Sequence, residues 1–565
     1  MASTNKSLER DQAYFDRRWA AMSNERSTFQ GHWKEIAEFT QPRKGRFFIS
    51  DRNKGTKRHQ SIINSAATQA LRTATSGMLA GTMSPTRPWF GLETHDHKLM
   101  ERQEVKTWLF EVENVMRTVM NDSNFYGQAS TMLTELLAFG TAAMSHEDDF
   151  EDVARFYTHT VGSYVIGQND RYEVDTFGRE FEWTTEQIVA GFDYENCSKA
   201  VQDEYDRGNY MVWHAIRHII EPNPMYEEGS ELNTKMKFTS VYYEPTATNG
   251  ALRNRFLRKS GFKEFPVFVP RWSVTGEDIY ATDCPGMTSL GDVKGLQIQE
   301  KRKAQGIDKM VNPPLSGPAS VRNANVNALP GGLTIYDQGI GDQRLAPLYM
   351  VNPQLQEMRV DIEAIEMRME KAYFNDLFLA ISNMEGIQPR NQLDIIQRNE
   401  ERLLQLGPVL EQLQGEFLDP LIDRVFNQAS RADILPPPPD GVEGTSLRIK
   451  YISTLAMAQR AVATQNIDRM VQFAGGLMQM GFPDAGMKVD ALQAVDEYAK
   501  AIGAPPTVIV PDEIVQQKLA AQQQQQQQAQ QLEAAQQGAN VAKMASEAKL
   551  SEDESLLTEA VGGDE

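Results

Sequence analysis

The amino-acid sequence predicts an α+β fold in which α-helices predominate. Apolar residues recur at helical spacing through long stretches toward both ends of the chain, whereas residues 153–273 form short β-branched and aromatic runs separated by Gly, Asn, Asp and Pro. Such runs are typical of antiparallel strands, and the lack of regular strand and helix alternation argues against a parallel nucleotide-binding sheet. With 565 residues, of which 41% are hydrophobic, the chain is long enough for three or four units.

The N-terminal region combines helices with a basic segment. Residues 8–39 place aromatic and apolar side chains mostly at helical steps, and Pro42 ends the pattern, so we expect one or two amphipathic helices. Residues 43–58 are the most basic stretch of the chain, and Phe47 and Phe48 lie within it. This segment could bind phosphates and stack on bases, but pairing with acidic neighbours in an assembly is the preferred interpretation.

Three further helices are expected before the strand block. Residues 61–83 carry small side chains with apolar ones at helical spacing and stop at Pro85, which predicts a buried helix followed by a turn. Residues 105–120 and 129–143 repeat the helical pattern, and residues 121–127 separate them.

The most distinctive arrangement is a pair of helices that bracket a small β insertion. Residues 289–311 are helical and end at a Pro-Pro pair, and residues 353–381 form a second helix that begins with proline, which the first turn tolerates. In the intervening residues 312–352, Gly and Pro turns flank short strand-like pieces.

Helices are expected again in the C-terminal part of the chain. Residues 391–429 form a long helical stretch with a bend near Pro408, and the proline run 436–439 makes an extended break. A further helical set covers residues 446–502. From Pro511 onward the tail is rich in Gln and Ala, which predicts either disorder or a helix that needs neighbouring copies.

Composition and motifs exclude several classes of function. The 57 Lys and Arg against 77 Asp and Glu give a net charge of −20, which disfavours a general nucleic-acid coat. Two distant cysteines offer neither a disulfide framework nor a zinc cluster, and no signal peptide or membrane span is expected. Phosphate-binding loops and the GxSxG, HExxH and EF-hand patterns do not occur. We therefore expect no enzyme activity, no catalytic residues, no cofactor and no metal site.

Several segments resemble the head-to-tail connector, or portal, proteins of short-tailed bacteriophages (podovirus type). They lie between residues 19 and 439 in the family's order, and none is catalytic, so the resemblance depends on their number and order. The segments are TATSGMLAGTMSPTRPWFGL, LLAFGTAAM, EFPVFVPRWSVTGEDIY, SLGDVKGLQIQEKRKAQGIDKMVNPPL, PGG and LGPVLEQLQGEFLDPLIDRVF.

The resemblance implies a ring-shaped homo-oligomer of about twelve copies at one capsid vertex of the virion, made in the host bacterial cytoplasm. Double-stranded DNA would pass through its channel without sequence recognition, inward during packaging and outward during genome ejection. Implied protein partners are the terminase large subunit, tail adaptor and tail tube proteins, capsid protein, scaffold and internal core proteins, with no membrane. The main alternative is another structural virion oligomer, such as a tail adaptor or capsid component, and a third is an enzyme with an unrecognised site.

The resemblance also divides the chain into the parts of a portal fold. They are the N-terminal helices and basic segment (1–60), a β-containing wing (61–288), a first stem helix (289–311), a clip (312–352), a second stem helix (353–381), a channel loop with a long tunnel helix (382–445), a helical crown (446–510) and a C-terminal barrel helix or disordered tail (511–565).

Two sets of residues are candidate sites under this resemblance. Lys294 and Lys301 are seven residues apart on the first stem helix and share a face, so they are candidates for contacts with DNA phosphates in the channel. The alternative for both is pairing between subunits with acids such as Glu363 or Glu366. In the clip, Pro330, Gly331 and Gly332 are candidates for partner binding.

The two stem helices also carry apolar residues that one subunit cannot easily cover, which predicts contact between copies. These residues are Val293, Leu296 and Ile307 on the first helix and Ile362, Ile365 and Met369 on the second.

Overall fold

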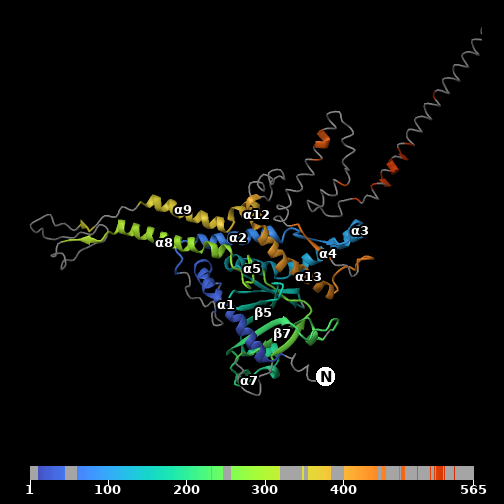
Figure 1. Ribbon diagram of the computed structural model, residues 1–565, viewed down its shortest axis with the longest axis horizontal. Coiled ribbons are helices and arrows are strands. Elements are labelled where there is room, and N and C mark those ends of the chain that lie inside the picture. The colour runs from blue at the N-terminus through green and yellow to red at the C-terminus, as the bar shows by residue number, and fades with distance from the viewer. Residues whose placement is uncertain are drawn as a thin grey trace, which may run out of the picture. The chain divides into compact units, whose positions relative to one another are not determined.

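The computed structural model describes a mixed α and β protein (Figure 1). The described residues are 10–42, 44, 47, 60–149, 151–230, 232–245, 256–317, 346–348, 354–382, 400–442, 447–452, 470, 473–476, 493, 510, 515, 517–518, 520–522, 524–525, 527 and 540. They fall into two units, and each is described by itself. The first comprises residues 1–93, 111–437 and 447–462, and the second comprises residues 94–110, 438–446 and 463–565.

The first unit begins with one long helix, α1 (Gln12–Thr40), whose N-terminus is capped by the Asp11 side chain. Aromatic residues four apart, Phe15 and Trp19, share one helix face and are buried against the sheet residues Val165 and Val241. The expected amphipathic N-terminal helix is therefore confirmed as a single element, and its apolar face is a core contact.

Helices α2 (Ala66–Thr82), α4 (Gln103–Asp122) and α5 (Phe125–Phe139) confirm the three expected helices, with shifted boundaries. The predicted break at 121–127 shrinks to two residues. The helix expected to reach residue 143 ends at Phe139, because Gly140 adopts the left-handed conformation (φ 79°) that closes a helix C-terminus. Ala143 instead begins strand β2.

A five-stranded antiparallel sheet confirms the strand block. Its order is β4 (Tyr164–Gln168), β5 (Val174–Thr184), β6 (Trp213–Pro222), β7 (Phe238–Tyr243) and β8 (Arg258–Phe262). Between β5 and β6 the chain forms α6 (Thr185–Phe192), a 3-10 turn (Tyr194–Asn196) and α7 (Lys199–Asp206), and a second 3-10 turn (Asn233–Lys235) precedes β7. A three-stranded sheet has the order β3 (Val153–His159), β2 (Ala143–Asp149), β9 (Val267–Phe268).

The helix, insertion, helix arrangement is present. Helix α8 (Pro285–Val311) and helix α9 (Leu355–Ala372) run along each other in opposite directions (Figure 1). In the described ends of the insertion, β10 (Leu315–Ser316) pairs with β11 (Ala346–Pro347) in antiparallel register.

The second helix of this pair is shorter than expected from the sequence. It ends at Ala372, and α10 (Asn375–Ser382) follows as a separate element, because Phe374 adopts a left-handed backbone (φ 55°) that interrupts the helix. The helical spacing of apolar side chains continues across residues 373–374, so the sequence pattern gives no sign of the break.

The C-terminal part has one irregularity that was not predicted and one element that differs from expectation. Pro408 lies inside helix α12 (Glu400–Leu413), and a π-helical segment (Gln414–Leu418) precedes α13 (Asp419–Arg431). Leu447–Tyr451, expected within a helical set, is strand β12, which pairs with β1 (Phe90–Thr94). Cross-strand hydrogen bonding outweighs the local helical pattern here.

In the second unit, the Asp96 side chain caps the short helix α3 (His97–Glu101) by accepting from the Lys98 backbone N–H (2.9 Å). Arg102 then donates to the backbone carbonyl of Asp440 (Nη1 to O, 2.8 Å). Most of the predicted crown and tail lies outside the described residues. None of the helices that the structure describes is long and apolar enough for a membrane span.

Candidate functional site

The helix pair α8 and α9 is held together by a core within one chain. Val293 and Leu296 of α8 meet Ile362, Ile365 and Met369 of α9, and Ala67 of α2 completes the cluster. All of these side chains are buried. The expectation that these five residues need a neighbouring copy is therefore wrong, because the antiparallel partner helix covers them. Of the six predicted residues, Ile307 is exposed.

A partly buried group of polar contacts joins this helix pair to the residues just before α2. The Gln297 side chain accepts from the backbone N–H groups of Ile63 (2.6 Å) and Asn64 (2.9 Å) and donates to the Asn64 carbonyl (2.8 Å). Asn64 in turn donates to Glu366 on α9 (Nδ2 to Oε1, 2.8 Å). One buried amide side chain thus makes hydrogen bonds with three backbone groups of the segment before α2.

The two candidate channel lysines have different surroundings. Lys294 forms an ion pair with Glu35 of α1 in the same chain. Lys301, two turns further along α8, is exposed. The proposed alternative partners are engaged elsewhere, since Glu363 pairs with Arg359 (2.9 Å) and Glu366 accepts from Asn64.

The candidate clip residues Pro330, Gly331 and Gly332 lie outside the described residues. The described flanks, β10 and β11, show that the two arms of the insertion meet directly beyond α8. Leu348 continues this contact by donating its backbone N–H to the Pro314 carbonyl (2.7 Å).

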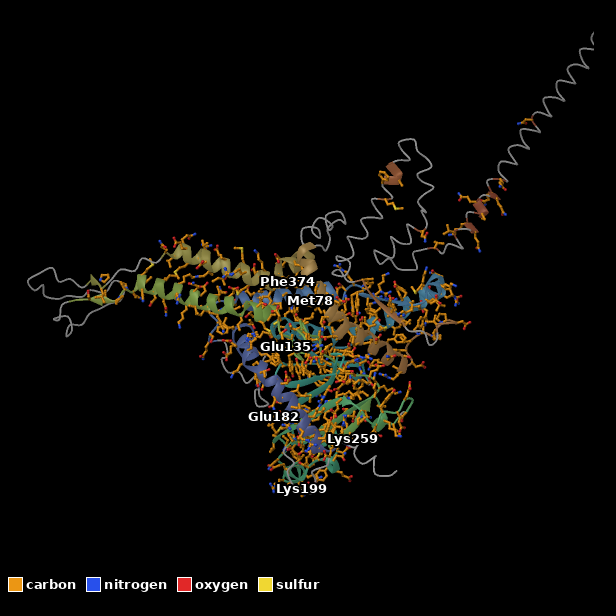
Figure 2. All side chains as sticks on the ribbon, in the orientation of Figure 1. Met78, Glu135, Glu182, Lys199, Lys259 and Phe374 are labelled. Atoms are coloured by element: carbon orange, nitrogen blue, oxygen red, sulfur yellow. The ribbon has the colours of Figure 1, made fainter. Side chains whose placement is uncertain are left out.

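Two glycines allow close contacts, one near the N-terminal end of α8 and one between α2 and α10. A Cβ added to Gly286, near the start of α8, would lie 2.1 Å from the carbonyl oxygen of Ala138. A Cβ added to Gly77 in α2 would lie 2.2 Å from the Cβ of Phe378 in α10. Met78 and Phe374 mark this α2 and α10 junction in Figure 2. Only glycine fits at either contact.

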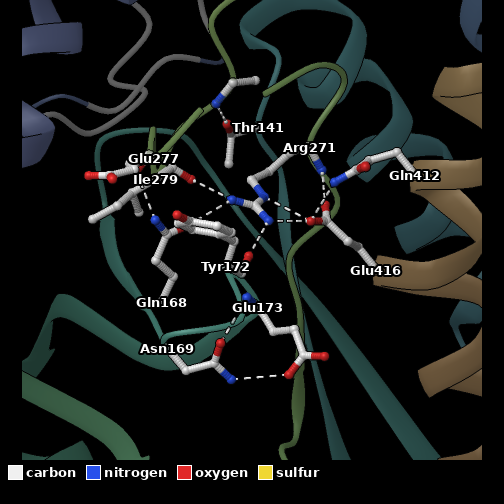
Figure 3. A network of polar contacts seen from close by, with 11 residues as sticks. Thr141, Gln168, Asn169, Tyr172, Glu173, Arg271, Glu277, Ile279, Gln412 and Glu416 are labelled. Atoms are coloured by element: carbon white, nitrogen blue, oxygen red, sulfur yellow. Dashed lines mark hydrogen bonds and ion pairs between the residues drawn. The ribbon is translucent and has the colours of Figure 1, made fainter. Parts of the chain in front are cut away.

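Figure 3 shows a buried arginine that joins three segments of the first unit. Arg271 is 4% exposed and pairs with Glu416 of the π-helical segment through its backbone N–H (2.8 Å) and its guanidinium Nε (2.9 Å). The same guanidinium donates to the backbone carbonyl of Tyr172 (2.8 Å) and to the Gln168 side chain (3.2 Å). Gln412 donates to Glu416 as well (2.7 Å).

Two titratable residues of the first unit, Glu135 and His146, are almost fully buried. Burial raises the pKa of the Glu135 carboxyl to about 7, although its oxygen accepts from the Val161 backbone N–H (3.1 Å). Burial, with the nearby Arg424 charge, lowers the pKa of His146 to about 3. The His146 ring stacks on Phe156 with 4.5 Å between centroids.

The described residues offer little that resembles a catalytic centre. Among them, no group of three or more His, Cys, Asp or Glu is placed to hold a metal ion. A groove of about 450 Å³ lies between α4 and the β2–β3 turn, lined by residues that include Asp122, Glu151 and Asp152 but no His, Cys or Ser. The most extensive feature of the described residues is the antiparallel helix pair α8 and α9 with its buried core.

Comparison with known proteins assigns this chain to a family. The model of the bacteriophage head to tail connecting protein family matches residues 12–510. The chain belongs to that connector family. Its curated relatives include the portal protein of Salmonella phage epsilon15, 40% identical over 95% of this chain and 96% of that protein. The probable portal protein of Bordetella phage BPP-1 is 39% identical over 93% of each chain.

A solved structure, the neck of an empty GTA particle computed with C6 symmetry, also resembles the connector chain. It covers 76% of this chain and 94% of that chain at 10% identity, with a TM-score of 0.31. A score of this size supports no conclusion about the connector fold.

Several residues that hold the connector chain together were not predicted from the sequence. Glu35 and Asn64 have no motif, and their partners lie hundreds of residues away. A signal did exist for Gln297, Arg271 and Glu416, because each lies in a segment that carries the family resemblance. Arg271 and Glu416 meet in space, so their two segments are linked by a shared contact.

Proposed function

We propose that this chain is a bacteriophage portal protein, which forms a ring of about twelve copies at one vertex of the capsid. The observation that carries the proposal is the 40% identity to the epsilon15 portal protein over nearly the whole length of both chains. The proposed role is structural, and the ring turns over no substrate. Its place is the virion, after synthesis in the host bacterium.

In this proposal α8 and α9 form the stem, and residues 312–352 form the clip, which includes Pro330, Gly331 and Gly332. Residues 61–288 form the wing. Residues 382–392 form the loop that reaches into the channel, and residues 446–510 form the crown. Double-stranded DNA passes along the channel during packaging by the terminase and during ejection. The remaining proposed partners are tail adaptor, capsid, scaffold and internal core proteins.

Exposed apolar residues on the helix pair support contact between copies. Ile298 of α8 and Val360 and Met367 of α9 are each more than half exposed, although the opposite faces of the same helices are buried. In a closed ring, the neighbouring copies remove such side chains from water, which stabilises the assembly by roughly 25 cal/mol per Å².

The charge of the chain also suits a DNA channel that must not bind its cargo tightly. A charge of −20 per copy repels a polyanion, so DNA can slide. Lys294 and Lys301 would supply weak phosphate contacts along α8, with no sequence recognition.

Native mass spectrometry and negative-stain imaging of the purified protein test the proposal. We expect closed rings with a central pore and a mass near twelve times the 63.6 kDa of one chain. A stable monomer at micromolar concentration over a range of salt would contradict the ring, and a solid particle without a pore would favour another virion component. ATP hydrolysis that survives further purification would contradict the structural role.

A further inference from the structure

An exposed aromatic patch lies far from the proposed stem. It comprises Tyr194, Tyr205, Tyr210, Met211 and Val212, from the segment around α7 and the loop that enters β6. Figure 1 shows α7 beyond the five-stranded sheet, on the side away from α8 and α9, and Figure 2 places Lys199 of α7 at that edge. We call this surface the α7 patch.

The three tyrosine rings of the α7 patch lie side by side, with the half-buried Tyr205 between the other two. The ring centroids of Tyr194 and Tyr205 are 6.0 Å apart, and those of Tyr205 and Tyr210 are 5.2 Å apart. Met211, next in the chain, is 75% exposed, and Tyr210 is 45% exposed. Exposed apolar residues that cluster in this way commonly mark a site of protein interaction.

The loop that carries these residues is held in place. The Tyr210 carbonyl accepts from the Glu186 backbone N–H (3.2 Å), and the Val212 carbonyl accepts from that of Thr185 (2.9 Å). The Tyr194 hydroxyl donates to Asp206 (2.9 Å). The patch is therefore presented by a defined backbone and needs little ordering when a partner binds.

The surroundings of the patch are acidic. Residues 186–207 contain six Asp or Glu and two cations. Both cations pair within α7 and the residue that follows it, Lys199 with Asp203 (2.7 Å) and Arg207 with Glu204 (3.7 Å). Arg258 of β8 adds a third cation, which donates to the Gly191 carbonyl (2.6 Å). The acids still outnumber the cations, so the local charge favours a positively charged partner and disfavours nucleic acid or an anionic membrane.

We propose that the α7 patch binds a Lys- or Arg-rich segment of a second polypeptide, one that carries an aromatic or aliphatic anchor. The anchor packs against Met211 and Val212. Guanidinium or ammonium groups lie over the tyrosine rings and beside the acids, where cation–π and ionic attraction act together. This binding surface does not depend on ring formation, so its failure and that of the proposed function can be told apart.

The chain offers a matched control for the same residue types. Met225 and Tyr226 are 42% and 48% exposed, and they follow β6, whereas Tyr210 and Met211 precede it. The ten residues of β6 separate the two pairs by roughly 30 Å. The loop 223–237 around the control pair has three acids and two lysines, so it lacks the strong acidic excess.

The test measures the Kd of a fluorescent peptide, made of lysine and leucine with one tryptophan, for the full-length protein. A control peptide has glutamate in place of each lysine. We expect the lysine peptide alone to bind, more weakly at higher salt. The Tyr210→Ser, Met211→Ser variant should weaken its Kd by roughly tenfold or more, and the Met225→Ser, Tyr226→Ser control by less than about twofold. Circular dichroism and native mass should be unchanged in both variants.

Equal binding by the α7-patch variant and the wild type, or an equal loss in the control variant, would overturn the proposal. A patch variant that folds but loses its native oligomeric mass would show that the surface joins copies of this chain.

A photo-reactive residue at position 211 in assembled particles identifies the natural partner. We expect a cross-link to a basic peptide of another protein, and a cross-link to this chain or to an acidic peptide would contradict the inference.

Discussion

Single buried carboxyl and imidazole groups make the stability of this protein depend on pH in two opposite directions. The pKa of Glu135 is about 7 in the folded protein and about 4.5 in the unfolded chain, so the folded state holds a proton that the unfolded state has already released. The free energy of unfolding therefore falls as pH rises from about 4.5 through 7. His146, with a folded pKa of about 3, must stay neutral, so stability falls as pH drops from about 6.5 toward 3. Between about pH 4.5 and 6.5 the two effects oppose each other, so the contribution of this pair to stability is nearly constant there and falls on either side.

Glu135→Gln tests the first of these effects. The amide keeps an oxygen that can accept from the Val161 N–H and removes the charge, so the variant should gain up to about 3 kcal/mol of unfolding free energy at pH 8 and little at pH 5. Denaturant unfolding at both pH values measures the difference. The same gain at both pH values would mean that packing, and not ionisation, is responsible.

The two lysines of α8 should respond differently to charge reversal. Lys294→Glu places a carboxylate against Glu35 and should lower the unfolding free energy by no more than about 1 kcal/mol. Lys301→Glu should leave stability and ring mass unchanged while weakening DNA retention in a salt-dependent way. Lys301→Gln separates loss of charge from reversal. If Lys301→Glu abolishes rings, the residue belongs to a subunit interface.

At the scale of elements, close contacts between helices depend on missing side chains. Gly77 lets α10 lie directly on α2, and the left-handed Phe374 turns the chain into that position. Neither requirement is visible in hydrophobic periodicity, which is why the sequence predicts one helix over residues 353–381. Local spacing identifies helices, whereas their ends depend on partners distant in sequence.

Gly77→Ala should destabilise the protein by about 1–3 kcal/mol, because the added methyl meets the Cβ of Phe378, close to the backbone, where little can move. Gly127→Ala in α5 is the matched control. Nothing lies within 4 Å of its added Cβ, so this change should be neutral or stabilising by up to about 1 kcal/mol. Thermal unfolding of both variants measures the difference in stability. Equal unfolding midpoints for Gly77→Ala and Gly127→Ala would contradict the proposed close contact.

The ion pair between Arg271 and the π-helical segment should be costly to break. Glu416→Gln leaves a guanidinium that is almost fully buried without its counter-charge, and we expect a loss of about 3–5 kcal/mol. Glu411→Gln, an exposed position one turn and a half earlier, should change stability by less than about 0.5 kcal/mol. Similar values for the two variants would show that the pair is replaceable.

The sequence allowed the helix pair, the intervening insertion and the antiparallel block to be predicted, because each has its own periodicity and turn residues. It also identified the apolar rows of α8 and α9 but assigned all six of their residues to contacts between copies, whereas five of them pack within the chain. Ile362 and Val293 in fact cover one another, and pattern alone cannot tell a partner helix of the same chain from that of a neighbour. Strand β12 was missed because its partner, β1, lies more than 350 residues earlier.

At the scale of the whole molecule, the acidic charge and the proposed ring reinforce one another. Each added copy brings −20, so assembly must overcome mutual repulsion, which salt screens. The apolar residues left exposed on α8 and α9 provide the opposing attraction. Ring formation should therefore be favoured by moderate salt.

Removal of residues 511–565 should leave the ring intact. A Gln- and Ala-rich stretch buries too little apolar area to offset the entropy of ordering, except against copies of itself. Native mass of the truncated protein measures this, with twelve times the shortened chain mass as the expected value. Loss of the ring on truncation would place the tail among the elements that hold subunits together.

The close contact between α10 and α2 has a consequence for folding during translation. Helix α2 packs against α5, which is synthesised soon after it, and against α9 and α10, which follow roughly 300 residues later. At about 5–20 residues per second, α2 waits some 15–60 s for its last partners. During translation its second face, with Ala67 and Gly77, stays open to water or to a chaperone. The nascent chain therefore completes this contact only after most of the message has been read.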